Sequence, residues 1–351
     1  MAVGLPLKTT YANGDVLSAS DVNDTNGTIN LFQSSTLSRA GGKNAIINGG
    51  FDIAQRGTSG TFTTTAKSFC LDRWYIPSAT GSSMAYSQQA STVAGTRYCA
   101  RIQRTSGNTS TTVISLSQDI ETSNSIIFAG QAVTISFYAR SGSNYSSASS
   151  ALNHYLIQGT GTDQSDYSAG FTGRTVASSG TATLTTSWQR FTYTATLASS
   201  ATELSLQIYY TPVGTAGTND YFEITGVQIE LGNYATSFSR AGGTIQGELA
   251  ACRRYLPAIT GATGSIIGYA VSANTPYYVY QFDVPARVAP TGLTTSGTFS
   301  GYVGGTASTI TPVFDSANQH SAAFKGSMTI SAQAATIAFY SGTILFTGCE
   351  L

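Results

Sequence analysis

The stretch EITGVQIELGNYATSFSRAGGTIQGELAACRRY, residues 223–255, contains two kinds of structure and the joint between them. The residues up to Leu231 predict the last strand of a β domain, and the glycines at 242 and 243 predict a bend. After the bend, apolar residues recur at steps of four, three and four, as on one face of a helix: Ile245, Leu249, Cys252 and Leu256. Because Pro257 follows, the helix should end there. The stretch thus predicts a strand that leads through a hinge and a short helix into the rest of the chain.

Charged residues are unusually scarce in this chain. Only 10% of its 351 residues are Asp, Glu, Lys or Arg, and the formal net charge is zero. In ordinary proteins the charged share is about a quarter. Because nucleic-acid binding requires a concentrated positive surface, DNA and RNA are excluded as partners. The apolar share of 41% is ordinary, so the chain should fold into roughly two or three domains with cores of their own.

No part of the sequence predicts a membrane segment or conventional secretion. No run approaches the roughly eighteen consecutive apolar residues of a membrane-spanning helix, and residues 1–7 lack the regions of a signal peptide. A β protein that is rich in Ser, Thr and Tyr and poor in charge exposes adhesive strand edges unless they are paired or covered. This composition therefore favours an oligomer.

Residues 1–42 predict an attachment segment that contains a short helix. Ser18 and Asp21 resemble a capping box at the start of this helix. One helical stripe is then formed by Val22, Ile29 and Phe32. So short a stripe is hardly stable alone, and we expect it to pack against its copies or to dock on a partner.

Residues 43–240 predict an antiparallel β-sandwich, because short alternating runs lie between clusters of Gly, Ser, Asn and Thr. The runs that alternate most clearly are 133–140, 191–197 and 203–209. Residues 241–257 form the predicted helical junction. Residues 258–351 predict a second β domain, in which residues 277–282 alternate and a proline-marked edge follows.

Several phrases of this sequence occur, in the same order, in modules of bacteriophage tail-fibre and related virion proteins, which the chain resembles. The phrases are NAIINGGFDIAQRG at 44–57, DRW at 72–74, VTISFYARSG at 133–142, WQRF at 188–191 and the stretch quoted first. Together they span about 200 residues, and DVLSASDVN at 15–23 resembles the N-termini of many phage structural proteins. The resemblance implies an all-β chain: an antiparallel jelly-roll β-sandwich like a carbohydrate-binding module, a short helix, and a second C-terminal β-sandwich as the distal tip.

The resemblance also implies a structural virion fibre protein that attaches to a host cell-surface glycan and is not an enzyme. We expect it on the exterior of the tail or capsid, after assembly in the host cytoplasm, with residues 1–42 bound to other virion proteins. A homotrimer is expected, with two apolar helical faces as interface candidates: Val22, Ile29, Phe32, Ile245, Leu249, Cys252 and Leu256. A head fibre or capsid decoration protein is the alternative, and a polysaccharide depolymerase is a further one.

The sequence contains no recognisable catalytic arrangement. His154 and His320 lie in polar stretches that we expect to be exposed, and no nucleophile elbow is near either. Glu223 and Glu230 are seven positions apart, which puts them on opposite faces of a regular strand and weakens them as a catalytic carboxylate pair. The chain also lacks the periodic turns of a depolymerase β-helix.

The four cysteines are expected to be buried free thiols. They lie far apart and form no CxxC pair, and a Cys70–Cys99 disulfide is the alternative. No cofactor is expected apart from a structural calcium, which jelly-roll carbohydrate modules often hold. Asp52 and Glu230 are its candidates, and a hydrogen-bonding role is the favoured interpretation of both.

Glycan binding needs an aromatic face for the sugar ring and polar groups for its hydroxyls. The chain has 20 tyrosines, and those in Gly/Ser-rich loops are the best candidates, with ordinary surface positions as the alternative. The candidates are Tyr145, Tyr167 with its neighbours Asp163, Gln164 and Asp166, and in the distal domain Tyr277 and Tyr302. Trp74 and Trp188 lie in motifs shared by the fold, so we expect both in the core.

Overall fold

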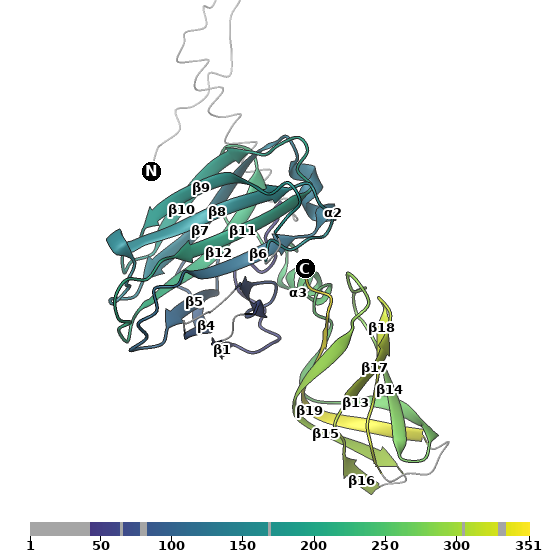
Figure 1. Cartoon of the computed structure of the whole chain (residues 1–351). Helices are drawn as coiled ribbons and strands as arrows, with labels where there is room; N and C mark the ends of the chain where they lie inside the picture. Colours follow the sequence, from purple (N-terminus) through teal and green to yellow (C-terminus); the bar gives the residue numbers. More distant parts are fainter. Residues whose placement is uncertain (1–42, 64–65, 78–82, 168–169, 304–305, 329–334) are drawn as a thin grey trace, which may run out of the picture.

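The computed structural model describes residues 43–63, 66–77, 83–167, 170–303, 306–328 and 335–351 (Figure 1). The attachment segment predicted over residues 1–42, with its stripe of Val22, Ile29 and Phe32, lies outside the described residues. No helix within the described part is long and apolar enough to cross a membrane.

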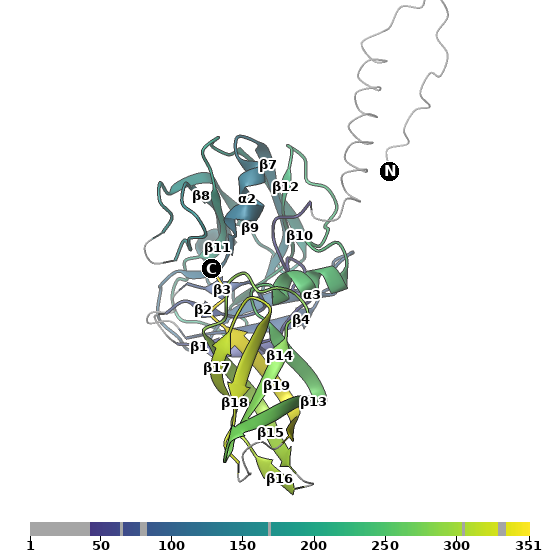
Figure 2. The same cartoon turned by 90° about the vertical axis from the view of Figure 1, so that its right-hand side faces the viewer.

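The described strands between Ser59 and Leu231 form two antiparallel sheets of six strands each. The first sheet has the order β1 (Ser59–Phe62), β4 (Met84–Ala90), β5 (Tyr98–Arg104), β12 (Tyr221–Leu231), β7 (Ala132–Ser141) and β10 (Gln189–Thr196). The second has the order β2 (Ser68–Phe69), β3 (Tyr75–Ile76), β6 (Ile114–Ile120), β11 (Glu203–Tyr210), β8 (Ala151–Gly159) and β9 (Thr175–Thr183). The two sheets pack face to face around one core (Figures 1 and 2), which confirms the predicted jelly-roll β-sandwich.

The core of the sandwich follows from the alternation of its strands. The long regular strands contribute every second residue, and the buried members include Ile135 and Phe137 from β7 and Leu206 and Ile208 from β11. Trp74 is fully buried, with its ring 5.2 Å from that of Phe51, as expected of a core residue. Short helical segments border the strands: α2 (Thr122–Ser125), η1 (Ile126–Phe128) and η2 (Ala148–Ser150).

Trp188 does not lie in the core, which corrects our expectation. In the following strand β10, Phe191, Tyr193 and Ala195 pack against the core, so the even-numbered residues of this strand point outward. Trp188 directly precedes β10, and its even number puts it on the same outward side. It is half-buried. The guanidinium carbon of Arg140 lies 4.9 Å from its ring centroid, so the indole is covered by a cation and not by the opposite sheet.

Strand β12 contains a bulge that reverses the inward and outward positions along it. The pairing with β7 shifts register between Thr225 and Gln228, and Gly226 has a φ of 61°. Before the bulge Phe222 and Ile224 fill the core, and after it Val227 and Ile229 do. A residue with a Cβ is strained at such a φ, so glycine is required here. Glu223 and Glu230 therefore lie on the same outer face, whereas a regular strand would have put them on opposite faces.

The predicted short helix is α3 (Ile245–Arg253). It begins at Thr244, whose hydroxyl accepts a hydrogen bond from the Gly247 amide at 3.0 Å. Its apolar side packs on the sandwich of its own chain, where Cys252 and Tyr255 form a small cluster with Ile47 and Ile53. The helix thus fixes the direction in which the chain leaves the sandwich.

This packing corrects part of the expected trimer interface. Cys252 is buried against the sandwich, and Leu256 is buried in a separate cluster with Ala258 and Leu345. Neither side chain can face another copy, because α3 lies flat on the domain that precedes it. Leu249 is half-buried, and Ile245 remains 43% exposed.

The chain after α3 forms a single seven-stranded antiparallel sheet, the C-terminal sheet. Its order is β16 (Thr306–Thr309), β15 (Gly292–Val303), β19 (Ala335–Thr347), β13 (Ala258–Ser272), β14 (Thr275–Gln281), β18 (Ser321–Lys325) and β17 (Val313–Ala317). The sheet curls so that β15 and β17 approach each other (Figure 1). Its inner face encloses a core of its own around Tyr278, Phe299, Phe324 and Phe346. The predicted second sandwich is thus formed by two halves of one sheet.

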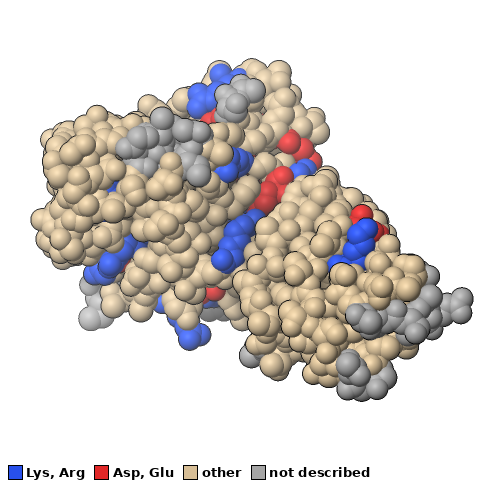
Figure 3. Space-filling view, turned by 60° about the horizontal axis from the view of Figure 1, so that its bottom comes forward, with Lys and Arg blue, Asp and Glu red and all other residues tan. Residues whose placement is uncertain are grey.

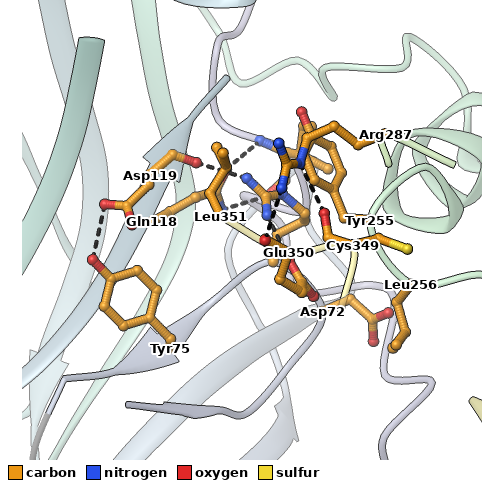
Figure 4. A network of polar contacts seen from close by, with 12 residues as sticks. Asp72, Tyr75, Gln118, Asp119, Tyr255, Leu256, Arg287, Cys349, Glu350 and Leu351 are labelled. Carbon is orange, nitrogen blue, oxygen red and sulfur yellow. Dashed lines mark hydrogen bonds and ion pairs between the residues drawn. The ribbon is translucent and has the colours of Figure 1, made fainter. Parts of the chain in front are cut away.

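The end of the chain returns to the sandwich after β19. Glu350 accepts hydrogen bonds from Arg73 at 2.6 Å and from Arg56 at 2.9 Å. The carbonyl oxygens of Cys349 and Glu350 accept from Arg287 at 2.8 Å and 3.0 Å (Figure 4). Because these groups come from three separate parts of the chain, they tie the C-terminal sheet to the sandwich.

A second set of contacts connects α3 to the same region. Glu121 accepts hydrogen bonds from Arg254 at 2.5 Å and 3.0 Å and from the Tyr255 hydroxyl at 2.8 Å. Burial alone would raise the pKa of Glu121, but these hydrogen bonds lower it. The guanidinium of Arg73 also lies 3.6 Å from the centroid of the Tyr255 ring.

The cysteines and one histidine are buried. All four cysteines are free and buried, which confirms the expected thiols, and burial raises the pKa of Cys70 and of Cys99 to about 12. His154 is 1% exposed, contrary to our expectation, because it shares the inward parity of Leu152 and Leu156 in β8. Its ring centroid lies 4.0 Å from that of Tyr193. His320 is exposed, as expected.

Candidate functional site

The outer face of the second sheet of the sandwich is polar and aromatic. In β11, Leu204, Leu206 and Ile208 fill the core, so the alternate residues point outward. The same alternation applies in β6 and β8, which flank β11 (Figures 1 and 2). We call this surface the tyrosine face; it consists of Ser115, Ser117, Asn153, Tyr155, Ser205, Gln207 and Tyr209.

The strand register places these side chains in two cross-strand rows. Tyr209 pairs with Ser115 on one side and with Asn153 on the other. Gln207 pairs with Ser117 and with Tyr155 in the same way. Each row therefore contains a hydroxyl, an amide and a phenol ring within the width of three strands.

The serines form the floor of this face and the tyrosines rise above it. Ser115, Ser117 and Ser205 are at most 4% exposed, whereas Tyr155 and Tyr209 are half-buried. The two tyrosine rings have centroids 4.9 Å apart and planes inclined at 32°. Burial and the neighbouring Tyr155 raise the pKa of Tyr209 to about 12, so its hydroxyl stays protonated at neutral pH.

The amides of the tyrosine face have free hydrogen-bonding groups. Within the described part of the chain, the side chain of Gln207 makes no hydrogen bond. The Asn153 Oδ1 accepts one bond, from the Thr181 hydroxyl at 2.7 Å. A half-buried amide that has no intramolecular partner can donate to and accept from a ligand.

One end of the tyrosine face is closed by a buried polar cluster. Asp119 accepts hydrogen bonds from Tyr75 at 2.8 Å, from Ser165 at 2.6 Å and from Lys67 at 3.2 Å. The Lys67 ammonium lies 3.8 Å from the centroid of the Tyr75 ring. Burial lowers the pKa of Lys67 despite the neighbouring Asp119. All groups of the cluster are thus used within the molecule.

The loop that follows β8 contributes an ion pair at the same end. Arg174 donates to both carboxylate oxygens of Asp166, at 2.6 Å and 3.1 Å. This hydrogen bonding raises the pKa of Arg174, and Tyr155 and Tyr75 contribute to the same shift. The side chain of Arg174 is 41% exposed, and Arg174 directly precedes Thr175, which pairs with Gln158 of β8. A guanidinium in this position can donate to a ligand on the tyrosine face.

Most of the loop residues that the sequence indicated serve to hold the loop. Asp163 accepts from the Thr122 amide at 3.0 Å and from Arg287 at 3.3 Å. Gln164 is bonded to Thr172 through both ends of its amide, at 2.7 Å and 3.0 Å. Tyr167 is half-buried beside Ser165. The structure thus brings Asp166 to the end of the tyrosine face, with Tyr167 next to it in the loop and with Asp163 and Gln164 as loop supports.

Tyr145 does not lie free in a loop, which corrects our expectation. Its ring packs against the core with its centroid 4.7 Å from that of Tyr210. Its hydroxyl donates to the Ala151 carbonyl at 2.9 Å, and burial raises its pKa. Both its face and its polar end are used for packing.

Tyr277 and Tyr302 lie on the C-terminal sheet and not on the sandwich. Tyr277 is half-buried with the Lys325 ammonium 5.9 Å from its ring centroid. Tyr302 is 37% exposed and packs edge-on against Phe339, with centroids 4.8 Å apart. The structure therefore does not bring these two together with the loop candidates.

The main residues of the tyrosine face were not among the sequence candidates. Alternation over residues 203–209 already put Gln207 and Tyr209 on one side of a strand. What the sequence lacked was the register that sets β8 beside β11 and so places Tyr155 next to Tyr209.

The carboxylates considered for metal binding or catalysis have intramolecular partners. Asp52 accepts from Arg240 at 2.8 Å, and Glu230 accepts from Thr236 at 2.6 Å and 2.8 Å. Glu223 is held by Arg101 at 2.6 Å and by Arg140 at 2.5 Å. Among the described residues, no three Asp, Glu, His or Cys side chains are grouped as a metal ion would need. The structural calcium remains a prediction.

No protein-family model matches this sequence, and no curated relative matches it. Among solved structures, a CBM4 carbohydrate-binding module is 22% identical over 53% of this chain and 98% of that chain, with a TM-score of 0.32. The family 11 carbohydrate-binding module of the cellulase Lic26A-Cel5E from Clostridium thermocellum is 12% identical over 49% and 96%, with a TM-score of 0.30. The enzymatically active domain of tailspike protein 4 from bacteriophage CBA120 is 11% identical over 54% and 21%, with a TM-score of 0.33. These likenesses concern the fold of about half of the chain and identify no ligand.

Proposed function

We propose that the tyrosine face binds a glycan without cleaving it. The observation that supports this most directly is the pair of half-buried rings, Tyr155 and Tyr209, beside the amide of Gln207, whose side chain makes no hydrogen bond to the residues that the structure describes. A phenol ring offers an apolar surface to the C–H groups of a sugar and a polar end to its hydroxyls. An amide beside it supplies a donor and an acceptor in fixed positions.

The chemistry of the face favours a neutral saccharide. The outward residues of the two rows are hydroxyls, amides and phenols, with Arg174 as a cation at one end and its charge paired with Asp166. Such a surface recognises its ligand by stacking and hydrogen bonding. A strongly ionic polymer would meet few compensating charges.

Non-enzymatic binding is supported by the partners of the carboxylates. Glu223 and Glu230 share one outer face, but both are buried and hydrogen-bonded within the chain. Glycoside hydrolysis needs one carboxyl group free to donate a proton and another free to attack or activate water. Neither condition is met by two carboxylates that are fully occupied.

In the particle, the chain would be a virion fibre protein on the exterior of the tail or capsid. The order of the sequence motifs supports this role, as does the sequence of sandwich, short helix and C-terminal sheet. Residues 1–42 would bind other virion proteins, and the chain would assemble as a homotrimer in the host cytoplasm. The ligand would be a glycan of the host cell surface.

A glycan array tests the binding. The full chain should bind one class of neutral saccharides, and Tyr209→Ala and Gln207→Ala should each weaken that binding by about tenfold or more. Tyr234→Ala is the matched control, since Tyr234 is 73% exposed on the sandwich but outside the tyrosine face. Equal binding by the wild type and all three variants would refute the assignment of the glycan site to the tyrosine face. Absence of binding to the array and to susceptible cells would refute glycan binding itself.

A further inference from the structure

The outer face of the C-terminal sheet has a patch of large exposed apolar side chains. In these strands the inward positions fill the core, as Tyr278, Phe299 and Ala338 do, and the residues beside them point outward. We call the outward group the apolar patch: Tyr302 of β15 is 37% exposed, Ile337 and Phe339 of β19 are 40% and 46%, Ile267 and Tyr269 of β13 are 79% and 47%, and Val279 of β14 is 53%.

The strand register makes this patch continuous. Tyr302 pairs directly with Ile337, and Ile337 pairs with Ile267, so three neighbouring strands place apolar side chains in one row. Phe339 fills the diagonal position, with its ring centroid 4.8 Å from that of Tyr302. Scattered exposed apolar residues are ordinary, but a contiguous group across four strands is typical of an interaction surface.

The surroundings of the apolar patch are almost uncharged. Among the described strands of the C-terminal sheet, Asp315 and Lys325 are the two charged residues, and they pair with each other at 3.1 Å. In Figure 3 the side of this unit that faces the viewer is almost entirely uncharged outside the grey atoms, apart from one small group of charged residues. The patch therefore has no charge with which to select an ionic partner.

The composition of the patch points to a protein partner. Ile267, Ile337 and Val279 have no hydrogen-bonding group, and Ile267 is the most exposed large apolar side chain in the described part of the chain. A sugar would leave its hydroxyls unsatisfied over such residues, whereas another apolar protein surface would bury them at no such cost. The exposed fractions of these six residues correspond to roughly 600 Å² together, at the upper end of the roughly 300–600 Å² of the largest apolar patch on a typical monomer and below the ~800 Å² that each partner contributes to a standard interface.

We propose that the apolar patch is the surface through which a second copy of this chain binds. An uncharged apolar surface is compatible with itself, because contact between copies brings no like charges together. The formal net charge of the chain is zero, so whole copies do not repel each other either. The inference rests on the self-association proposed above and assigns a surface to it, and it does not depend on the sandwich binding a glycan.

Size-exclusion chromatography with light scattering tests this surface. The full chain should have a mass that is a multiple of 36.5 kDa at micromolar concentration. Ile267→Glu and Ile337→Glu, made separately, should each reduce the mass to that of one chain. Val213→Glu is the matched control, because Val213 is 50% exposed but lies on the sandwich, and it should associate like the wild type. Circular dichroism of each variant confirms that it is folded.

A cross-link locates the contact independently. All four natural cysteines are buried and free, so Ile267→Cys would introduce the reactive thiol. Under mild oxidation this variant should form a disulfide-linked dimer, and Val213→Cys should not. A cross-link in both variants would contradict a specific contact at Ile267, and a cross-link in neither would exclude an arrangement in which two Ile267 side chains meet.

The outcomes separate this inference from the proposals it builds on. A wild-type chain that is monomeric overturns both self-association and the apolar patch as its surface. A multimer that persists in both glutamate variants overturns the patch alone. Glycan binding is measured separately: a monomeric Ile267→Glu chain should bind each immobilised glycan through one site and dissociate faster than the wild type. Its loss of all binding would contradict the independence of the two surfaces.

Discussion

The guanidinium of Arg73 donates a hydrogen bond to Glu350 at 2.6 Å, although 277 positions separate the two residues in the sequence. Both side chains are buried, at 2% and 8% exposure. Arg73 follows β2 in the sandwich and Glu350 follows the last strand of the C-terminal sheet, so the pair joins the two units. Arg56 and Arg287 bind the same end of the chain. These charged contacts therefore help to fix the orientation of the C-terminal sheet, together with the bonds of Arg254 and Tyr255 to Glu121.

Glu350→Ala should destabilise the protein strongly. The substitution leaves Arg73 buried without its carboxylate, and loss of one member of a buried pair costs about 3 kcal/mol or more. The free energy of unfolding in guanidinium chloride at neutral pH measures the effect. Asp315→Ala removes the carboxylate of an exposed pair with Lys325 and is the matched control; its unfolding midpoint should stay near that of the wild type. Equal midpoints for both variants would contradict the role of Glu350.

Acid should destabilise the sandwich partly through His154. Burial lowers the pKa of His154 to about 4, from an ordinary value of 6.5. Between these values the unfolded chain binds a proton that the folded chain does not, so the free energy of unfolding rises with pH. The contribution of this site is complete above about pH 6.5 and is lost as the pH falls toward about 4, on the order of 3 kcal/mol in all.

The comparison of two histidine variants isolates this effect from the carboxylates. His154→Phe should reduce the loss of stability between pH 7 and pH 4.5, because the ring is retained and no proton is taken up on unfolding. His320→Gln should leave the loss unchanged, since His320 is exposed. Urea denaturation at pH 7 and at pH 4.5 gives the free energy of unfolding of each protein, and therefore its loss between the two pH values. The hypothesis fails if His154→Phe and wild type lose the same stability.

Gly226→Ala should destabilise the sandwich by about 1–2 kcal/mol, the usual cost of a left-handed backbone for a residue with a Cβ. Gly226 has a φ of 61°, and an added Cβ would lie 3.2 Å from the Tyr138 ring. Gly261→Ala is the control, because Gly261 lacks a left-handed φ and an added Cβ there would have no neighbour closer than 4.0 Å. Thermal unfolding of both variants measures the change in stability. If Gly226→Ala unfolds at the same temperature as the wild type, the bulge tolerates a side chain.

Alternation in the sequence located strands well, because a strand exposes every second residue wherever one face is buried. The predicted runs 133–140 and 203–209 lie within β7 and β11, and the helix predicted from Ile245 is α3. The same rule failed in β12, where counting from Glu223 to Glu230 ignores the extra residue of the bulge. The isolated Gly226 is a sequence sign of this bulge, but by itself it does not show that the parity of the strand changes.

The candidate site was harder to predict because it depends on register between distant strands. Tyr145 has the local sequence of an exposed loop, and only its contact with Tyr210 shows that it is packed. Tyr155 and Tyr209 look ordinary in sequence, and pairing of β8 with β11 is what makes them neighbours. Side-chain pairs across strands are a property of the sheet, and no local pattern encodes them.

Tyr155 and Tyr209 should act together in glycan binding. Their ring centroids are 4.9 Å apart, which is close enough for one saccharide to contact both. Tyr155→Ala and Tyr209→Ala should each reduce affinity by about tenfold. The double variant should lose less than the product of the two effects, because the second truncation removes a contact that the first has already weakened.

Isothermal titration of the wild type, the two single variants and the double variant with the saccharide found on the array gives the coupling between Tyr155 and Tyr209. Tyr209→Phe adds a finer comparison, since it retains the ring and removes the hydroxyl, and it should fall between the wild type and Tyr209→Ala. Tyr302→Ala alters an exposed tyrosine of the C-terminal sheet and should leave the affinity unchanged. Independent effects of Tyr155 and Tyr209 would show that the ligand contacts them through separate sugars, and unchanged affinity in both single variants would place the binding site elsewhere on the chain.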